Sequence, residues 1–134
     1  MNKKINYKAK LDRIFSQYIR LRDRLPNSEV VKCISCGKII HWKESDCGHY
    51  VTRNVLGLRY NEQNCNAQCR KCNRFDEANK TGYTLGLIQK YGKNIIEILH
   101  AAKNKHIKIT QFEYEALIQH YTNEVKKLEN INSN

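Results

Sequence analysis

The sequence predicts an α+β fold class: a small zinc-stabilised core of short strands, with one helix before it and several helices after it. Two Cys-x2-Cys pairs, Cys33 with Cys36 and Cys69 with Cys72, enclose 32 residues and are typical of a zinc site. Short extended segments lie between the pairs, and apolar residues recur at helical spacing towards both ends of the chain. At 134 residues the chain is long enough for one domain with a modest core.

The first predicted element is a helix over residues 7–24. Residues 1–24 carry eight basic and two acidic residues, so the outer face of this helix either contacts a polyanion or is simply solvated. Pro26 and Asn27 end the helix. Its apolar stripe consists of Leu11, Ile14, Phe15, Tyr18 and Ile19.

Residues 30–82 are predicted to form the core. Gly37 follows the first cysteine pair, where a tight turn needs a residue that tolerates positive φ. A loop is expected over residues 52–60, and a helix is expected to begin near Asn73, after the second pair. The extended segments are expected at residues 30–32, 38–42, 45–51 and 62–68.

Residues 83–129 are predicted to be a helical tail. Its helices are expected over residues 83–91, 94–102 and 110–129. Gly92 is suited to end the first of them, and Thr110 with Glu113 forms a capping box at the start of the last. The apolar stripes of these helices indicate core packing, and residues 130–134 are expected to fray.

Charge and hydropathy limit which partners and which cellular compartment we expect for this protein. The net charge of +11, from 24 basic and 13 acidic residues, indicates a polyanion partner, most simply nucleic acid; the alternative is that the charge serves solubility alone. No apolar run is long enough to span a membrane, and the first residues lack the apolar segment of a signal peptide. We therefore expect a cytoplasmic protein without a membrane partner, in a reducing compartment where cysteines bind metal instead of forming disulfides.

The two cysteine pairs offer four thiolates for a closed, structural zinc ion. Such a site leaves no position open to substrate, so this zinc is not expected to take part in catalysis. Cys65 with Cys69 could form an alternative ligand pair, but that choice would discard an intact Cys-x2-Cys motif. Cys47 and Cys65 are interpreted instead as small buried apolar residues.

The central stretch resembles the HNH branch of the ββα-metal, or His-Me finger, nucleases. His49 matches the base histidine of that family and Asn64 its middle asparagine. Asn73 directly follows Cys72, where a ligand borne by the helix belongs. The resemblance implies a treble-clef-like ββα-metal core and a Mg²⁺- or Mn²⁺-dependent DNA endonuclease.

A more specific resemblance, covering most of residues 11–121, is to the NinG (Rap) recombination family of lambdoid phages. It implies a protein of a phage or prophage in a bacterial host that cuts Holliday junctions and other branched DNA, with a phage recombinase as a further partner. Paired cuts would also suit a homodimer, with the C-terminal helices as its interface. The resemblance rests on residues 11–20, Cys33-x2-Cys36-Gly37, residues 41–44, Asp46-Cys-Gly-His49 and residues 64–75.

The residue chemistry is consistent with this activity. A neutral histidine can take the proton of an attacking water, so His49 is the candidate general base. An asparagine oxygen can hold Mg²⁺ and leave several waters on the ion, which makes Asn73 the candidate ligand, at the start of a helix that favours anions. Asn64 either holds the loop that carries His49 or is an ordinary turn residue. Phosphate contacts are expected from Arg53, Arg70, Lys71 and Arg74.

The chain departs from the HNH pattern at the position directly before the base histidine. Many HNH enzymes place a metal ligand directly before the base, where this chain has Gly48. Either the metal has a single ligand side chain, or Asp46 reaches it through a bend at Gly48; otherwise Asp46 pairs with an arginine or belongs to a turn. Two alternatives to a branch-specific enzyme stay open: a general HNH nicking endonuclease, and a zinc module that binds DNA without cutting it.

Overall fold

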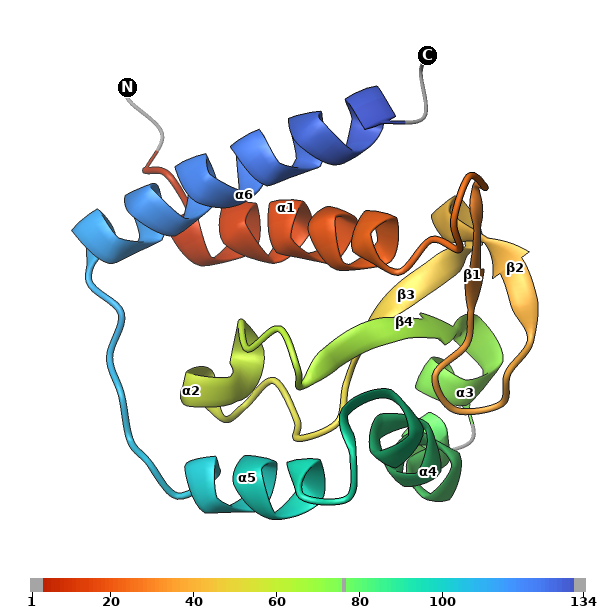
Figure 1. Cartoon of the computed structure of the whole chain (residues 1–134). Helices are drawn as coiled ribbons and strands as arrows, with labels where there is room; N and C mark the ends of the chain where they lie inside the picture. The colour runs from red at the N-terminus through yellow and green to blue at the C-terminus, as the bar shows by residue number, and fades with distance from the viewer. Residues whose placement is uncertain (1–3, 76, 132–134) are drawn as a thin grey trace.

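The computed structural model describes residues 4–75 and 77–131. Over these ranges the chain is a mixed α+β domain with six α-helices and two small antiparallel sheets. Helices α1 and α6 lie side by side on one side of the β3–β4 sheet, and α4 and α5 lie on the other side (Figure 1). None of the described helices is long and apolar enough to cross a bilayer.

Helix α1 (Tyr7–Arg22) forms as predicted but ends at Arg22, because Arg24 joins Val31 in an isolated β-bridge. The Asn6 side chain caps the helix by accepting a hydrogen bond from the N–H of Ala9 at 2.9 Å. The residues of its inner face that are buried are Leu11, Phe15, Ile19 and Leu21.

Two arginines expected on the outer face of this helix instead point inward. Arg22 donates to the backbone oxygens of Glu62 and Cys65 at 2.8 and 2.9 Å. Arg24 donates to the backbone oxygen of Leu128 at 2.7 Å. Both guanidinium groups therefore donate to partly buried backbone oxygens of other elements, and the basic face of α1 is smaller than the sequence suggests.

The core region contains two hairpin-like pairs of strands. Gly37 adopts a φ of 79° in the turn of the first pair, as its position after Cys36 predicts. The strand expected over residues 45–51 ends at His49, and the final extended segment begins at Cys65 instead of residue 62. The pairs are β1 (Val30–Lys32) with β2 (Ile39–His41), and β3 (Ser45–His49) with β4 (Cys65–Cys69).

The helices after the first cysteine pair differ from the predictions mainly at their ends. A short helix, α2 (Leu56–Arg59), occupies part of the predicted loop, and α3 (Arg70–Arg74) begins before Asn73. Residues 130 and 131 are helical, not frayed, and residues 132–134 lie outside the described residues. The remaining elements are 3-10 helices at Trp42–Glu44 and Glu77–Asn79, α4 (Lys80–Tyr91), α5 (Ile95–Ala102) and α6 (Gln111–Ile131).

The apolar core has a separate cluster on each side of the β3–β4 sheet. On one side, Phe15 of α1 packs edge-to-face on Tyr121 of α6, with ring centroids 4.9 Å apart. On the other side, Tyr83 and Leu87 of α4 pack with Leu99 of α5. The buried face of α6 is therefore used within the chain, and the Thr110–Glu113 capping box forms at its start as predicted.

Candidate active site and metal centre

Cys33, Cys36, Cys69 and Cys72 converge on one point, as the sequence predicts. Their sulfur atoms all lie within 4.8 Å of one another, and the Sγ atoms of Cys36 and Cys69 are 3.7 Å apart. Four thiolates around zinc, with bonds of about 2.3 Å, form a tetrahedron whose edges are about 3.8 Å. The four cysteines therefore fit a zinc ion.

This cluster joins the two strand pairs to α3. Cys33 follows β1, while Cys69 ends β4 and its side chain accepts a hydrogen bond from the N–H of Cys72 at 3.5 Å. The N–H of Ile34 also donates to the oxygen of Ala67 at 3.0 Å, which adds one backbone link between the strand pairs. Since neither two-stranded sheet is large enough to be stable alone, the metal would stabilise both.

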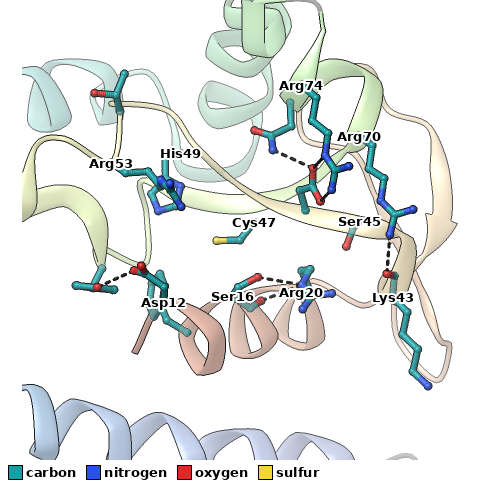
Figure 2. Close-up of a pocket in the computed structure, with 15 residues that line it drawn as sticks. Asp12, Ser16, Arg20, Lys43, Ser45, Cys47, His49, Arg53, Arg70 and Arg74 are labelled. Atoms are coloured by element: carbon teal, nitrogen blue, oxygen red, sulfur yellow. Dashed lines mark hydrogen bonds and ion pairs between the residues drawn. The ribbon is translucent and has the colours of Figure 1, made fainter. Parts of the chain in front are cut away.

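A cleft of about 580 Å³ opens between α1, β3 and α3, and it contains most of the predicted site (Figure 2). Its walls include one histidine and two carboxylates, from Asp12 and Asp46. Five cations, from four separate segments, outnumber these two carboxylates. The excess of positive charge suits the cleft to a polyanion. These cations are Arg20, Lys43, Arg53, Arg70 and Arg74.

His49 lies at the end of β3, half-buried in this cleft. Its Nε2 atom is 3.0 Å from the backbone oxygen of Arg59. Because a carbonyl oxygen only accepts, Nε2 carries the proton in the neutral ring and Nδ1 keeps its lone pair. Burial lowers the pKa of His49; the bond to the Arg59 carbonyl opposes this shift, and the charges of Arg53 and Arg59 add to it. The imidazole is therefore neutral near pH 7.

The carbonyl that orients His49 is itself held by α1. The Arg59 guanidinium donates to both carboxylate oxygens of Asp12, with Nε–Oδ1 and Nη2–Oδ2 distances of 2.9 and 2.6 Å. The Tyr60 hydroxyl donates to Asp12 Oδ1 at 2.7 Å. Asp12 and Arg59 are 47 positions apart, so no local motif in the sequence indicates this contact.

Asn64 is fully buried, and its side chain ties down the segment that follows His49. Its Nδ2 atom donates to the backbone oxygens of Val51 and Leu58, both at 3.0 Å. Its Oδ1 atom accepts from the N–H of Val51 at 2.8 Å. Of the two roles left open for Asn64, these contacts fit the residue that holds the loop better than an ordinary turn residue.

Asp46 and Asn73 lie side by side in the cleft, since Asn73 Nδ2 donates to Asp46 Oδ2 at 3.0 Å. Arg74 donates to both carboxylate oxygens of Asp46, at 2.9 and 3.0 Å. Burial alone would raise the pKa of Asp46, but the bonds from Arg74 and Asn73 outweigh it and lower that pKa. Asp46 is thus an ionised carboxylate paired with Arg74, which matches the expected alternative that Asp46 pairs with an arginine.

Two details of this region differ from the predictions. Asn73 lies inside α3, which begins at Arg70, so the expected placement at a helix N-terminus is wrong. The β3–β4 pairing continues through Gly48 without a bulge, so Asp46 enters the cleft without a bend there. A Cβ atom on Gly48 would lie 2.0 Å from Oε1 of Gln68, so a side chain at the position before His49 would require Gln68 to move.

The structure separates the four cations that were predicted to contact phosphate. Arg53, Arg70 and Arg74 line the cleft, but Lys71 lines a different depression, beside Cys36 and Cys72. Two further cations line the cleft. Arg20 belongs to the basic face of the first helix, which was expected either to contact a polyanion or to be solvated, whereas Lys43 was not expected in the site. Arg20 is held at Nε by the backbone oxygen and the hydroxyl of Ser16, both at 3.2 Å, so its terminal nitrogens are available to the cleft.

Comparison with known proteins identifies the family. A family model described as the bacteriophage lambda NinG protein matches residues 1–132. The chain belongs to the NinG family. Relatives in the family include the protein ninG of Escherichia phage lambda, 35% identical over 118 residues, and that of Escherichia phage 933W, 34% identical over 118 residues. The protein ninG of Salmonella phage P22 is 33% identical over 113 residues.

These relatives are longer than the chain. The alignments cover 87%, 87% and 83% of this chain, but 54%, 55% and 52% of the ninG proteins of phages lambda, 933W and P22. The chain therefore spans about half the length of the NinG relatives it matches. No solved structure matches it.

Proposed function

We propose that this NinG-family protein is a metal-dependent DNA endonuclease of the HNH type that cuts branched DNA during phage recombination. The observation that carries the proposal is the hydrogen bond from His49 Nε2 to the Arg59 carbonyl, inside a cleft with five cations. This bond selects the tautomer whose Nδ1 can accept a proton. A module that only binds DNA needs no such arrangement.

The order of elements supports a treble-clef-like ββα-metal core. Strand β3 carries His49, β4 follows the loop, and α3 carries Asn73, all within residues 45–74. Zinc bound in the closed site of the four cysteines would fix α3 against the strands. His49 and Asn73 are thereby held at two ends of one rigid frame.

The cleft residues divide the chemistry of phosphodiester hydrolysis between them. His49 takes a proton from the attacking water at Nδ1, while the Arg59 carbonyl holds the resulting imidazolium through Nε2–H. Arg53 and Arg70 hold the phosphate that is cut, since guanidinium groups bind phosphate oxygens in a forked geometry. Asn64 keeps the loop after His49 in place, so the base stays aligned with the phosphate.

The side-chain oxygens of Asp46 and Asn73 are the hard ligands that Mg²⁺ or Mn²⁺ prefers. The two side chains are in contact through Asn73 Nδ2, and a turn of the amide would present its oxygen beside Asp46 instead. When bound, the ion would supply positive charge to the scissile phosphate and to the leaving 3′ oxygen. The guanidinium of Arg74 now occupies the face of Asp46 where a cation belongs. Arg74 is more than half exposed, at 54% of its side chain, so it is free to turn from Asp46 to a DNA phosphate.

The proposed partner is branched DNA, with a phage recombinase as a second partner and a homodimer as the active form. Two copies related by a two-fold axis would present two clefts to opposite strands of a junction. The buried face of α6 is already packed on α1, so a dimer would have to use surfaces that remain exposed, such as the one around Phe112.

The decisive experiment compares wild type with His49→Ala and Asn73→Ala on a synthetic four-way junction in Mg²⁺. We expect cleavage to fall by at least about a hundredfold in both variants, the contribution typical of a general base or a metal. Junction binding, measured by mobility shift in Ca²⁺, should persist. Equal cleavage by wild type and His49→Ala would reject the mechanism, and binding without cleavage by wild type would favour the binding module.

A linear duplex of the same sequence tests the branch preference. A branch-specific enzyme cuts the junction and leaves the duplex intact, whereas a general nicking endonuclease cuts both. The same purified protein and the same metal are used for the two substrates, so the comparison depends on DNA shape alone.

A further inference from the structure

Three soft metal ligands lie together on one face of the β3–β4 sheet. Cys47 and His49 are two positions apart on β3, so their side chains share a face, and His49 is paired directly with Cys65 on β4. The ligand atoms of these three side chains all lie within 4.8 Å of one another. This cluster uses none of the four cysteines of the first site.

Two of the three ligand atoms hydrogen-bond to the same atom, the backbone oxygen of Arg59, and an ion bound through them would replace that contact. Cys65 Sγ donates to the backbone oxygen of Arg59 at 3.5 Å, and His49 Nε2 is 3.0 Å from the same oxygen. Cys47 and His49 line the cleft, while Cys65 is fully buried behind them. An ion that enters from the cleft therefore meets Cys47 and His49 first and Cys65 at the back.

The ligand set selects the class of metal. Two thiolates and an imidazole bind Zn²⁺ or Cd²⁺ and disfavour Mg²⁺, which requires oxygen ligands. Around a tetrahedral zinc ion these ligand atoms would be about 3.6 to 3.8 Å apart. They now lie within 4.8 Å of one another, so side-chain shifts of about 1 Å would bring them to that spacing. Three protein ligands leave the fourth position open towards the cleft, unlike the closed site of four cysteines.

We propose that Cys47, His49 and Cys65 form a second, lower-affinity site for a thiophilic divalent cation, and that its occupation switches off the nuclease. The switching half of this inference rests on the proposed function; the binding half does not. Zinc would then be a structural ion at the first site and an inhibitor at the second, with Mg²⁺ supporting cleavage beside it.

Inhibition follows from the two nitrogens of imidazole. A metal at Nδ1 occupies the lone pair that accepts the proton of the attacking water. A metal at Nε2 displaces the hydrogen bond to the Arg59 carbonyl, and the neutral ring then carries its proton on Nδ1. In either case His49 has no free lone pair and cannot act as a base.

The binding test uses the full chain, equilibrated with Cd²⁺ or Co²⁺ in excess Mg²⁺, which occupies the oxygen ligands Asp46 and Asn73, and then analysed for Cd or Co by mass spectrometry. We expect two ions per wild-type chain and one per Cys47→Ser chain, and Co²⁺ at the second site should add a thiolate charge-transfer band. Thr52→Ala, at another residue lining the cleft, is the matched control and should bind two. One ion in wild type, or two in Cys47→Ser, would overturn the proposal whether or not the protein cuts DNA.

The switching test measures junction cleavage in Mg²⁺ with added Zn²⁺. Cys47→Ser should cleave as wild type does without added Zn²⁺, and should need at least about tenfold more Zn²⁺ for half-inhibition, because one of three ligands is lost. Equal sensitivity of the two proteins would overturn the switch. A wild type that binds two ions but never cleaves DNA would instead contradict the proposed function while leaving the site established.

Discussion

The most informative single residue is His49, because its surroundings define its protonation, its tautomer and its orientation. Burial keeps it neutral, and the Arg59 carbonyl assigns the proton to Nε2. That carbonyl is in turn positioned by the pairing of the Arg59 side chain with Asp12. Asp12 thus acts on His49 indirectly, through the side chain of Arg59 and then its carbonyl, and is a positioning residue.

Replacement of Asp12 tests this chain of contacts. Asp12→Asn removes the charge and one of the two bonds to Arg59, so junction cleavage is expected to fall about 10- to 100-fold, as for other residues that orient a ligand or base. Tyr60→Phe removes the hydroxyl, with its bonds to Asp12 and to the backbone oxygen of Lys8, but keeps the pairing of Asp12 with Arg59; it serves as the matched control, with a smaller loss. Cleavage is measured by single-turnover kinetics over a range of pH; an unchanged rate and pH profile in Asp12→Asn would contradict the role.

The lowered pKa of His49 also predicts a pH dependence. Cleavage should persist below pH 6.5, the ordinary value for histidine, and decline only as the pH falls through the lower pKa of the folded state. Between pH 6.5 and that lower pKa, the histidine is protonated in the unfolded chain but neutral in the folded one. The free energy of unfolding therefore falls as the pH is lowered through this range. Urea unfolding at several pH values should show this slope in wild type and a weaker slope in His49→Gln; equal slopes would argue against a buried neutral histidine.

Among the elements, the two strand pairs and α3 depend on one another. Helix α3 has only five residues and each sheet has two strands, so none of them is stable in isolation. The four cysteines join these pieces, and the side chain of Asn64 closes the loop between β3 and β4. The clusters around α1 with α6, and around α4 with α5, are packed by apolar side chains instead.

Removal of the zinc ligands should therefore destabilise one part of the molecule more than the others. Cys69→Ser is expected to lower the melting temperature by about 10 °C or more, because a structural zinc contributes several kcal/mol. Hydrogen exchange should rise first in residues 30–41 and 65–74, and junction cleavage should be lost. Cys47→Ser, which leaves the four-cysteine site intact, is the control, and identical exchange in the two variants would contradict a structural role.

At the scale of the whole molecule, folding turns a diffuse net charge into a localised one. The chain carries a net charge of +11, but five cations from α1, the Trp42–Glu44 turn, the loop after β3 and α3 face a single cleft. Other basic residues lie elsewhere: Arg22 and Arg24 donate to backbone oxygens of Cys65 and Leu128, and Lys71 lies beside the cysteine cluster.

The salt dependence of junction binding measures this localisation. If each cation of the cleft neutralises one phosphate, the slope of log affinity against log salt is about −4.5, from about −0.9 per contact. Arg20→Gln should make the slope less negative by about 1 and weaken binding to every DNA sequence alike. Lys71→Gln, outside the cleft, should leave the slope unchanged; an equal effect of both variants would contradict a DNA surface centred on the cleft.

The sequence by itself determined the features that depend on local spacing. The Cys-x2-Cys pairs, the capping box at Thr110 and the stripe of α1 each involve residues a few positions apart, and short-range geometry is encoded in such patterns. Only the tertiary structure decided which distant segments meet. The contact of Asp12 with Arg59, the placing of Arg20 and Lys43 in the cleft, and the meeting of Cys47 with Cys65 depend on strand register and helix packing, which a single sequence does not show. The local structure of each element is therefore largely predictable from the sequence, whereas the cleft around His49 forms only when these elements pack together.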